Sequence, residues 1–187
     1  MSIIKAVEAD ILHQISETLV NCVSEIKTLP GPWSYDLLKQ VLQKAPAVYV
    51  SFLGGQGNPD GFDASINARF DVYAVTKHFG NQQSARHGTN RTIGAYEIIE
   101  TILPRLHGHT IDDVGTLQLR NVDNLFGEAM FELGGIIYAA TFSLPNMTFP
   151  LNSDLTILSP FEIYNATHQL ADGLEPSAED HVELPQE

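Results

Sequence analysis

Hydrophobic residues near the start of the chain recur every three or four positions, which is the pattern of an amphipathic helix. They predict a helix over about residues 3–19 whose buried face is Ile4, Val7, Ile11, Ile15 and Leu19. A second helix is predicted after Ser34, because a serine hydroxyl is a favourable N-cap. This helix should end before Pro46, because the residue that precedes a proline avoids helical geometry.

A third helix is predicted after a polar loop at residues 80–91, with Thr92 as its N-cap. Pro104 is expected to shorten or kink the end of this helix. Its apolar face is predicted to be Ala95, Ile98, Ile99, Ile102, Leu103 and Leu106.

Runs of β-branched and aromatic residues between these helices are typical of strands. They predict strands at about residues 24–29, 47–53, 65–74, 116–122 and 134–144. The third of these alternates in polarity, so one face should meet the core: Ile66, Ala68, Phe70, Val72 and Ala74. The other face should meet water or a partner: Asn67, Arg69, Asp71 and Tyr73. The last strand is apolar enough to lie inside the sheet, and the glycine-rich segment 54–61 is expected to form a turn or loop.

The predicted order of elements is therefore α-β-α-β-β-α-β-β. This order indicates an α+β fold: a two-layer domain with a mostly antiparallel sheet flanked by helices. The alternation of helices and strands is too irregular for a doubly wound parallel sheet.

Charge divides the chain of 187 residues into two parts. The last basic residue is Arg120, and residues 121–187 hold 11 Asp and Glu without any Lys or Arg. Prolines interrupt the hydrophobic pattern after Leu144. We therefore expect a compact domain at residues 1–144 and an acidic C-terminal extension at 145–187. In this extension, residues 146–171 are expected to form a docking arm and residues 174–187 a mobile tail.

The formal net charge of −13 disfavours a protein that grips nucleic-acid phosphates or an anionic membrane. No stretch approaches about 18 consecutive apolar residues, so no membrane partner is expected. Cys22 is the only cysteine, which leaves no internal disulfide, and its place near the end of an apolar helical stripe predicts a buried core residue. The N-terminus lacks the apolar core of a signal peptide, so the protein is expected to be cytosolic where it is made.

Motifs for chemistry are largely missing, so no catalytic residue, cofactor or metal site is predicted and the protein is not expected to be an enzyme. The segment 54–61, GGQGNPDG, matches neither a phosphate loop nor a dinucleotide fingerprint. His107 and His109 with Asp112 suggest a remote alternative, a small metal-dependent hydrolase. The hydrolytic HxHxD pattern would, however, need an aspartate where Ile111 stands.

Several strings, in this order, resemble the tail terminator proteins of Mu-like phages and prophages. They lie within residues 3–144 and are Leu29-Pro30-Gly31, AVYVSFLGG, NARFDVYAVTKH, GAYEIIETILPRLHGH and GGIIYAATFSL. The extension at 145–187 departs from the family pattern, which ends shortly after the last strand.

The resemblance implies a structural virion protein at the head-proximal end of the tail. Copies would form a ring, a hexamer, that caps the tail tube and stops its polymerisation. The implied partners are further copies of the chain, the tail tube protein, the tail sheath where one is present, and the head–tail connector. DNA would pass through the lumen of the ring without specific binding. A head-completion or neck adaptor protein is the alternative, since small α+β domains serve in both places.

The polar segment 80–91 is the predicted contact with the tube, through Gln82, Arg86, His87 and Arg91. It is long and polar, and it carries two of the ten Lys and Arg residues of an acidic protein, which suits a partner contact. The other interpretation, an ordinary solvated loop, remains open at this point.

Overall fold

The computed structural model describes residues 2–31, 34–59, 64–77, 82–125, 127–149, 163–168 and 178–183. Contacts within the chain divide it into two units, Met1–Leu151 and Asn152–Glu187, and each is described separately. None of the described helices is long and apolar enough to cross a membrane.

The first two predicted helices are confirmed, and so is the predicted N-cap of the second, Ser34. α1 spans Ile3–Leu19 and α2 spans Tyr35–Gln43. The Oγ of Ser34 accepts a hydrogen bond from the backbone N–H of Leu37 at 3.2 Å, as expected of an N-cap.

The third predicted helix, α4, spans Ala95–Leu106, but its predicted cap is wrong. Gly94 is the N-cap, and its N–H donates a 2.9 Å hydrogen bond to Oε2 of Glu97. Thr92 instead forms an isolated β-bridge with Thr89.

Two short helices complete the first unit. α3 spans Gln82–His87 and α5 spans Glu128–Leu133. The segment 80–91, predicted as a loop, therefore contains a helix, too short and polar to show an apolar period.

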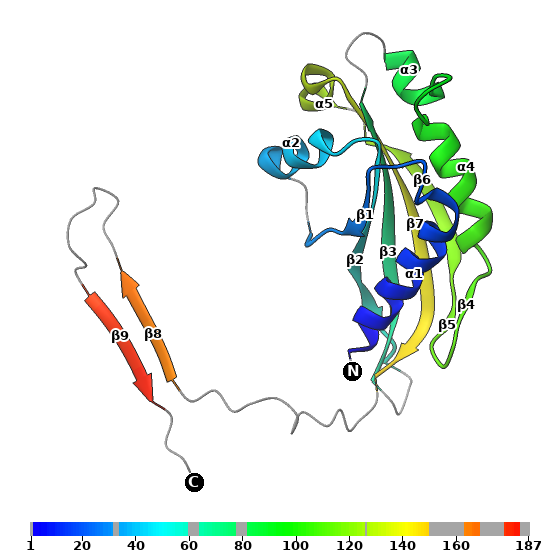
Figure 1. Ribbon diagram of the computed structural model, residues 1–187. Helices are drawn as coiled ribbons and strands as arrows, with labels where there is room; N and C mark the ends of the chain where they lie inside the picture. The colour runs from blue at the N-terminus through cyan, green and yellow to red at the C-terminus, as the bar shows by residue number, and fades with distance from the viewer. Residues whose placement is uncertain are drawn as a thin grey trace. The chain divides into compact units, whose positions relative to one another are not determined.

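A five-stranded sheet forms the centre of the first unit, in the order β1-β2-β3-β7-β6 (Figure 1). Its strands are β1 Glu25–Thr28, β2 Ala47–Gly57, β3 Ser65–Lys77, β6 Gln118–Asn124 and β7 Gly135–Thr148. β1 pairs in parallel with β2, and the other pairs are antiparallel. A small hairpin of β4 Thr110–Ile111 and β5 Gly115–Thr116 precedes β6.

The predicted α+β fold with a mostly antiparallel sheet is thus confirmed, and β7 lies inside the sheet as expected. β2 extends to Gly57, so half of the glycine-rich segment predicted as a loop is strand.

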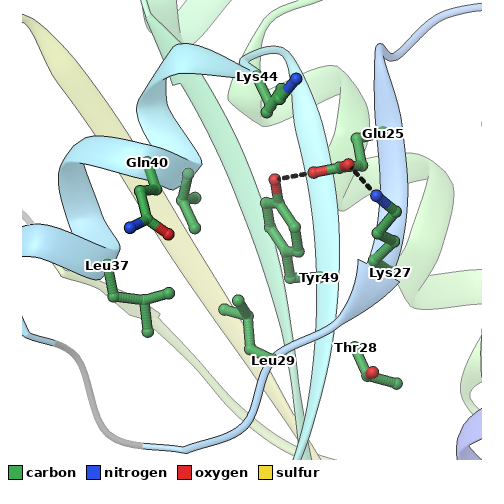
Figure 2. Close-up of a pocket in the computed structure, with 9 residues that line it drawn as sticks. Glu25, Lys27, Thr28, Leu29, Leu37, Gln40, Lys44 and Tyr49 are labelled. Carbon is green, nitrogen blue, oxygen red and sulfur yellow. Dashed lines mark hydrogen bonds and ion pairs between the residues drawn. The ribbon is translucent and has the colours of Figure 1, made fainter.

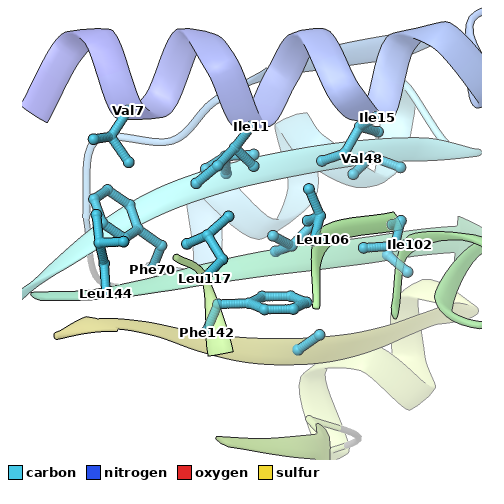
Figure 3. Packing of buried hydrophobic residues seen from close by; sticks show 14 of the residues in the cluster. Val7, Ile11, Ile15, Val48, Phe70, Ile102, Leu106, Leu117, Phe142 and Leu144 are labelled. Atoms are coloured by element: carbon cyan, nitrogen blue, oxygen red, sulfur yellow. The ribbon is translucent and has the colours of Figure 1, made fainter. Parts of the chain in front are cut away.

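The main core lies between the sheet and the two long helices, α1 and α4 (Figure 3). Val7, Ile11 and Ile15 of α1 point toward the sheet, where Phe70 and Phe142 are fully buried. The helical stripe and the inward face of β3 therefore meet as their spacing predicted. Cys22, in contrast, is exposed, because α1 ends at Leu19 and the cysteine lies in the turn that follows.

Among the described residues, α2 and α5 cover one half of the opposite face of the sheet. Leu38, Val41 and Leu42 of α2 pack there against Tyr49, Tyr73 and Val75, and Met130 of α5 joins them. Tyr73 and Asp71 are therefore buried, although the alternation placed them toward water or a partner. Asn67 and Arg69, farther along β3, are exposed as predicted.

The second unit contributes a hairpin of two antiparallel strands, β8 Ile163–His168 and β9 Ala178–Glu183. β9 falls within the segment 174–187, for which a mobile tail was expected. The remainder of the predicted docking arm and tail, apart from residues 146–149 in and after β7, lies outside the described residues.

Candidate interaction surfaces

The histidines of the suggested metal site meet different partners. Nδ1 of His107 accepts a hydrogen bond from the backbone N–H of Leu119 at 3.2 Å. Nε2 of His109 lies 2.6 Å from Oδ2 of Asp10 on α1. Asp112 lies exposed in the turn between β4 and β5. Among the described side chains, no three metal-binding residues gather closely enough to hold an ion. The two imidazoles instead form hydrogen bonds between the segment after α4 and its neighbours, Asp10 and Leu119.

Two of the four predicted contact residues, Arg86 and His87, lie at the C-terminal end of α3. His87 packs its ring on Tyr96 of α4 with centroids 5.2 Å apart, and Tyr96 packs on Tyr138 of β7 at 5.4 Å. Burial, together with the hydrogen bond to Tyr96, raises the pKa of Tyr138 to about 12, while the positive charge of Arg86 acts in the opposite direction. The Nε of Arg86 is buried and has no hydrogen-bond partner in the part of the chain that the structure describes.

The other two contact residues lie at the ends of this segment. Gln82 is the first residue of α3. Arg91 is exposed in the turn after α3, where its backbone N–H donates to Oγ1 of Thr89 at 3.2 Å. The structure thus places the His87 ring against Tyr96, buries the Nε of Arg86 and leaves Arg91 exposed to solvent. Whether they touch the tube remains a prediction.

A pocket of about 240 Å³ lies between β1, β2 and α2 (Figure 2). Glu25 accepts a 2.6 Å hydrogen bond from the hydroxyl of Tyr49 and pairs with the ammonium of Lys27. The hydrogen bond from Lys27, followed by that from Tyr49, lowers the pKa of Glu25. Burial first, and then the bonded carboxylate, raises the pKa of Tyr49. These groups satisfy one another, so they stabilise the contact between β1 and β2.

A second pocket, of about 350 Å³, lies on the half of the sheet that α2 and α5 leave open. We call it the arginine pocket, and its lining residues are Gln56, Asn67, Arg69, Arg120, Thr141 and Ser143. Arg69 lies on β3 and Arg120 on β6, on either side of β7. The two arginines are 51 residues apart in sequence, and only the strand order β3-β7-β6 places them in the same pocket, so no local sequence pattern indicates it.

The two edges of the sheet are also available for contacts. β1 forms one edge and β6 the other, and within the described part of the chain no strand pairs with the outer side of either. Six of the seven residues of β6 are exposed, including Val122 with 39% of its surface accessible. Unpaired backbone groups on such an edge are suited to pairing with another chain.

Comparison with known proteins shows which family the sequence resembles. The sequence model described as "Bacteriophage Mu, Gp37" matches residues 3–147. The chain is 30% identical over 171 residues to "Mu-like prophage FluMu protein gp37" of Haemophilus influenzae, with 89% of this chain and 81% of that protein covered. It is 24% identical over 183 residues to the "Probable tail terminator protein" of Escherichia phage Mu, with 96% and 93% covered.

Among solved structures, a chain in the virion of a native gene transfer agent particle aligns with a TM-score of 0.48 and 11% identity. The alignment covers 78% of this chain and 98% of that one.

Proposed function

The chain belongs to the family of bacteriophage Mu Gp37 and is a phage structural protein, not an enzyme, and on this premise we propose that it is a tail terminator. Its copies form a ring, a hexamer, on the head-proximal end of the completed tail tube. The ring stops further addition of tube subunits and presents a surface to the head connector. The observation that carries this proposal is the match to the phage Mu relative, which extends over 93% of that protein.

A closed ring requires two complementary surfaces on each subunit, so that copies join head to tail. The sheet supports this requirement, since its two edges, β1 and β6, lie on opposite sides of the same rigid core. The exposed backbone and side chains of β6 are the surface we assign to one side of the contact between neighbours.

The tube-facing surface in this proposal is the segment with Gln82, Arg86, His87 and Arg91. Support comes from the aromatic stacking that fixes α3 against α4, because a rigid presentation lowers the entropy lost on binding. Arginine and aromatic residues are also the types enriched in protein–protein contacts.

DNA passes through the lumen in this proposal without specific binding. The net charge of −13 supports this, because like charge keeps the phosphate backbone from adhering to the wall. The tail tube protein, the tail sheath where one is present, and the connector are the proposed partners.

Purified tail tubes provide a test of the capping step. The full chain is mixed with preformed tubes of the same phage and viewed by negative-stain electron microscopy. We expect density at one end of each tube only, and a six-subunit mass for the ring by native mass spectrometry. The double reversal Arg86→Glu with Arg91→Glu should form rings but leave the tube ends bare. Wild-type chain spread along the tube wall, or absent from both ends, would contradict the proposal.

A further inference from the structure

The arginine pocket is a concave, polar site on an otherwise acidic protein. Its six lining residues supply two guanidinium groups, two amides and two hydroxyls, and none of them is acidic. Two guanidinium groups with the amides of Gln56 and Asn67 offer N–H donors that suit a carboxylate or phosphate.

Neither arginine of the pocket has a carboxylate partner within the described residues. Nε of Arg120 donates to Oγ of Ser143 at 2.6 Å, which orients the guanidinium and leaves its other N–H groups for a ligand. Arg69 forms no ion pair with any described side chain. Asp71 shares this face of β3 but already accepts from Thr141 at 2.6 Å and from Tyr73 at 3.0 Å. This carboxylate offsets one of the two guanidinium charges at most, so the pocket with its neighbouring acid keeps a net positive charge.

The chain itself contains a matching anionic segment. Residues 172–187 hold six Asp and Glu and no Lys or Arg, so opposite charge favours their contact with the pocket. The rest of the protein is also acidic and would repel them from most other surfaces.

We propose that the arginine pocket binds the acidic segment 172–187 of a neighbouring copy in the ring. A neighbour is favoured because Arg120 lies on β6, the edge strand that we assigned to the contact between subunits. Carboxylates of the incoming segment pair with Arg69 and Arg120, and Gln56 and Asn67 border the entry. Tethering to a subunit already in the ring raises the effective concentration of the segment, so modest ion pairs suffice. This inference rests on the proposed ring.

The test uses two full-length variants, both with Cys22→Ser so that no native thiol competes. One variant carries Gln56→Cys at the border of the pocket, and the other carries Ser177→Cys in the acidic segment. After mixing, assembly and mild oxidation, we expect a disulfide between the two variants on a non-reducing gel. Adding Arg69→Glu and Arg120→Glu to the first variant should lower the yield of the crosslink at least ten-fold. Arg69→Gln with Arg120→Gln should lower the crosslink yield several-fold.

The matched control is Lys5→Glu with Lys39→Glu, two exposed lysines outside the pocket, which changes the net charge equally and should leave the crosslink unchanged. Native mass spectrometry of the same samples reports whether rings form. Rings without the crosslink would overturn this inference and leave the proposed function standing. If neither rings nor the crosslink formed, the inference and the proposed function would both be overturned. In a third variant, Gln56→Cys and Ser177→Cys are combined in one chain. A crosslink that formed only within this chain, and not between the two single-cysteine variants, would also overturn the inference. So would binding of a 20-base-pair DNA duplex that the arginine reversals abolish, because the pocket would then serve phosphates.

Discussion

The backbone of α3 and the turn after it approaches Gly94, the N-cap of α4, closely, and Gly94→Ala tests this approach. A Cβ at Gly94 would lie 2.5 Å from the carbonyl oxygen of Arg86 and 2.5 Å from the carbonyl carbon of His87, and closer still to the nitrogen of Gly88. All three are backbone atoms, so no side-chain rotation relieves the clash and α3 must move away.

The expected loss of stability follows from two effects. Overpacking of a well-packed site costs about 1–3 kcal/mol. Alanine is also a poorer N-cap than glycine, which adds up to about 1 kcal/mol. Together they predict a decrease of about 1–4 kcal/mol in the free energy of unfolding, or roughly 2–16 °C in melting temperature for a chain of this size.

Urea denaturation followed by circular dichroism measures this difference. Gly57→Ala is the matched control, because a Cβ there meets no atom within 4 Å and the residue lies in β2. The control should stay within about 0.5 kcal/mol of the parent protein. If Gly94→Ala were as stable as the control, the close approach of α3 and α4 would be refuted, and with it the rigid support assigned to Arg86 and His87.

Three further substitutions test the core and two carboxyl groups. Phe142→Ala should cost about 3–5 kcal/mol in denaturant unfolding, because Phe142 is 0% exposed, whereas Val122→Ala on the exposed edge should cost far less. Tyr49→Phe removes a hydrogen bond that, after the one from Lys27, lowers the pKa of Glu25. This pKa should therefore rise in an NMR titration, and the stability difference from wild type, present at pH 7, should shrink as pH falls through the pKa of Glu25. Burial raises the pKa of Glu8, which penalises its charged form in the folded protein. Glu8→Gln should consequently be more stable than wild type at pH 7 and show no gain below about pH 4, where the acid is protonated in both states. Equal stability of wild type and Glu8→Gln at pH 7 would show that this penalty is absent.

Local sequence patterns predicted the elements that have a strong period of their own. The stripe of α1 and the alternation of β3 are visible in the sequence, because each buries one face over many residues. Asp71 and Tyr73 were misplaced because α2, far away in sequence, covers half of the second face. Thr92 is a good cap by type, but the backbone contact at Gly94 fixes the start of α4 and depends on tertiary structure.

The candidate sites also differ in whether a local sequence pattern indicates them. The four predicted contact residues, on and beside α3, could be proposed from the sequence because they lie within one polar segment of twelve residues. The arginine pocket was not found, because Arg69 and Arg120 meet only through the order β3-β7-β6. Pairing of non-adjacent strands is not encoded in any local pattern, so a site built across them becomes visible only in the folded chain.

Electron microscopy of lysates from a phage deleted for this gene tests the central claim, that the protein ends tail-tube growth, most directly. The account predicts abnormally long, headless tail tubes beside full heads. Tails of normal length that fail to join heads would contradict it and indicate a neck adaptor instead. Normal infectious particles would contradict any required role at this joint.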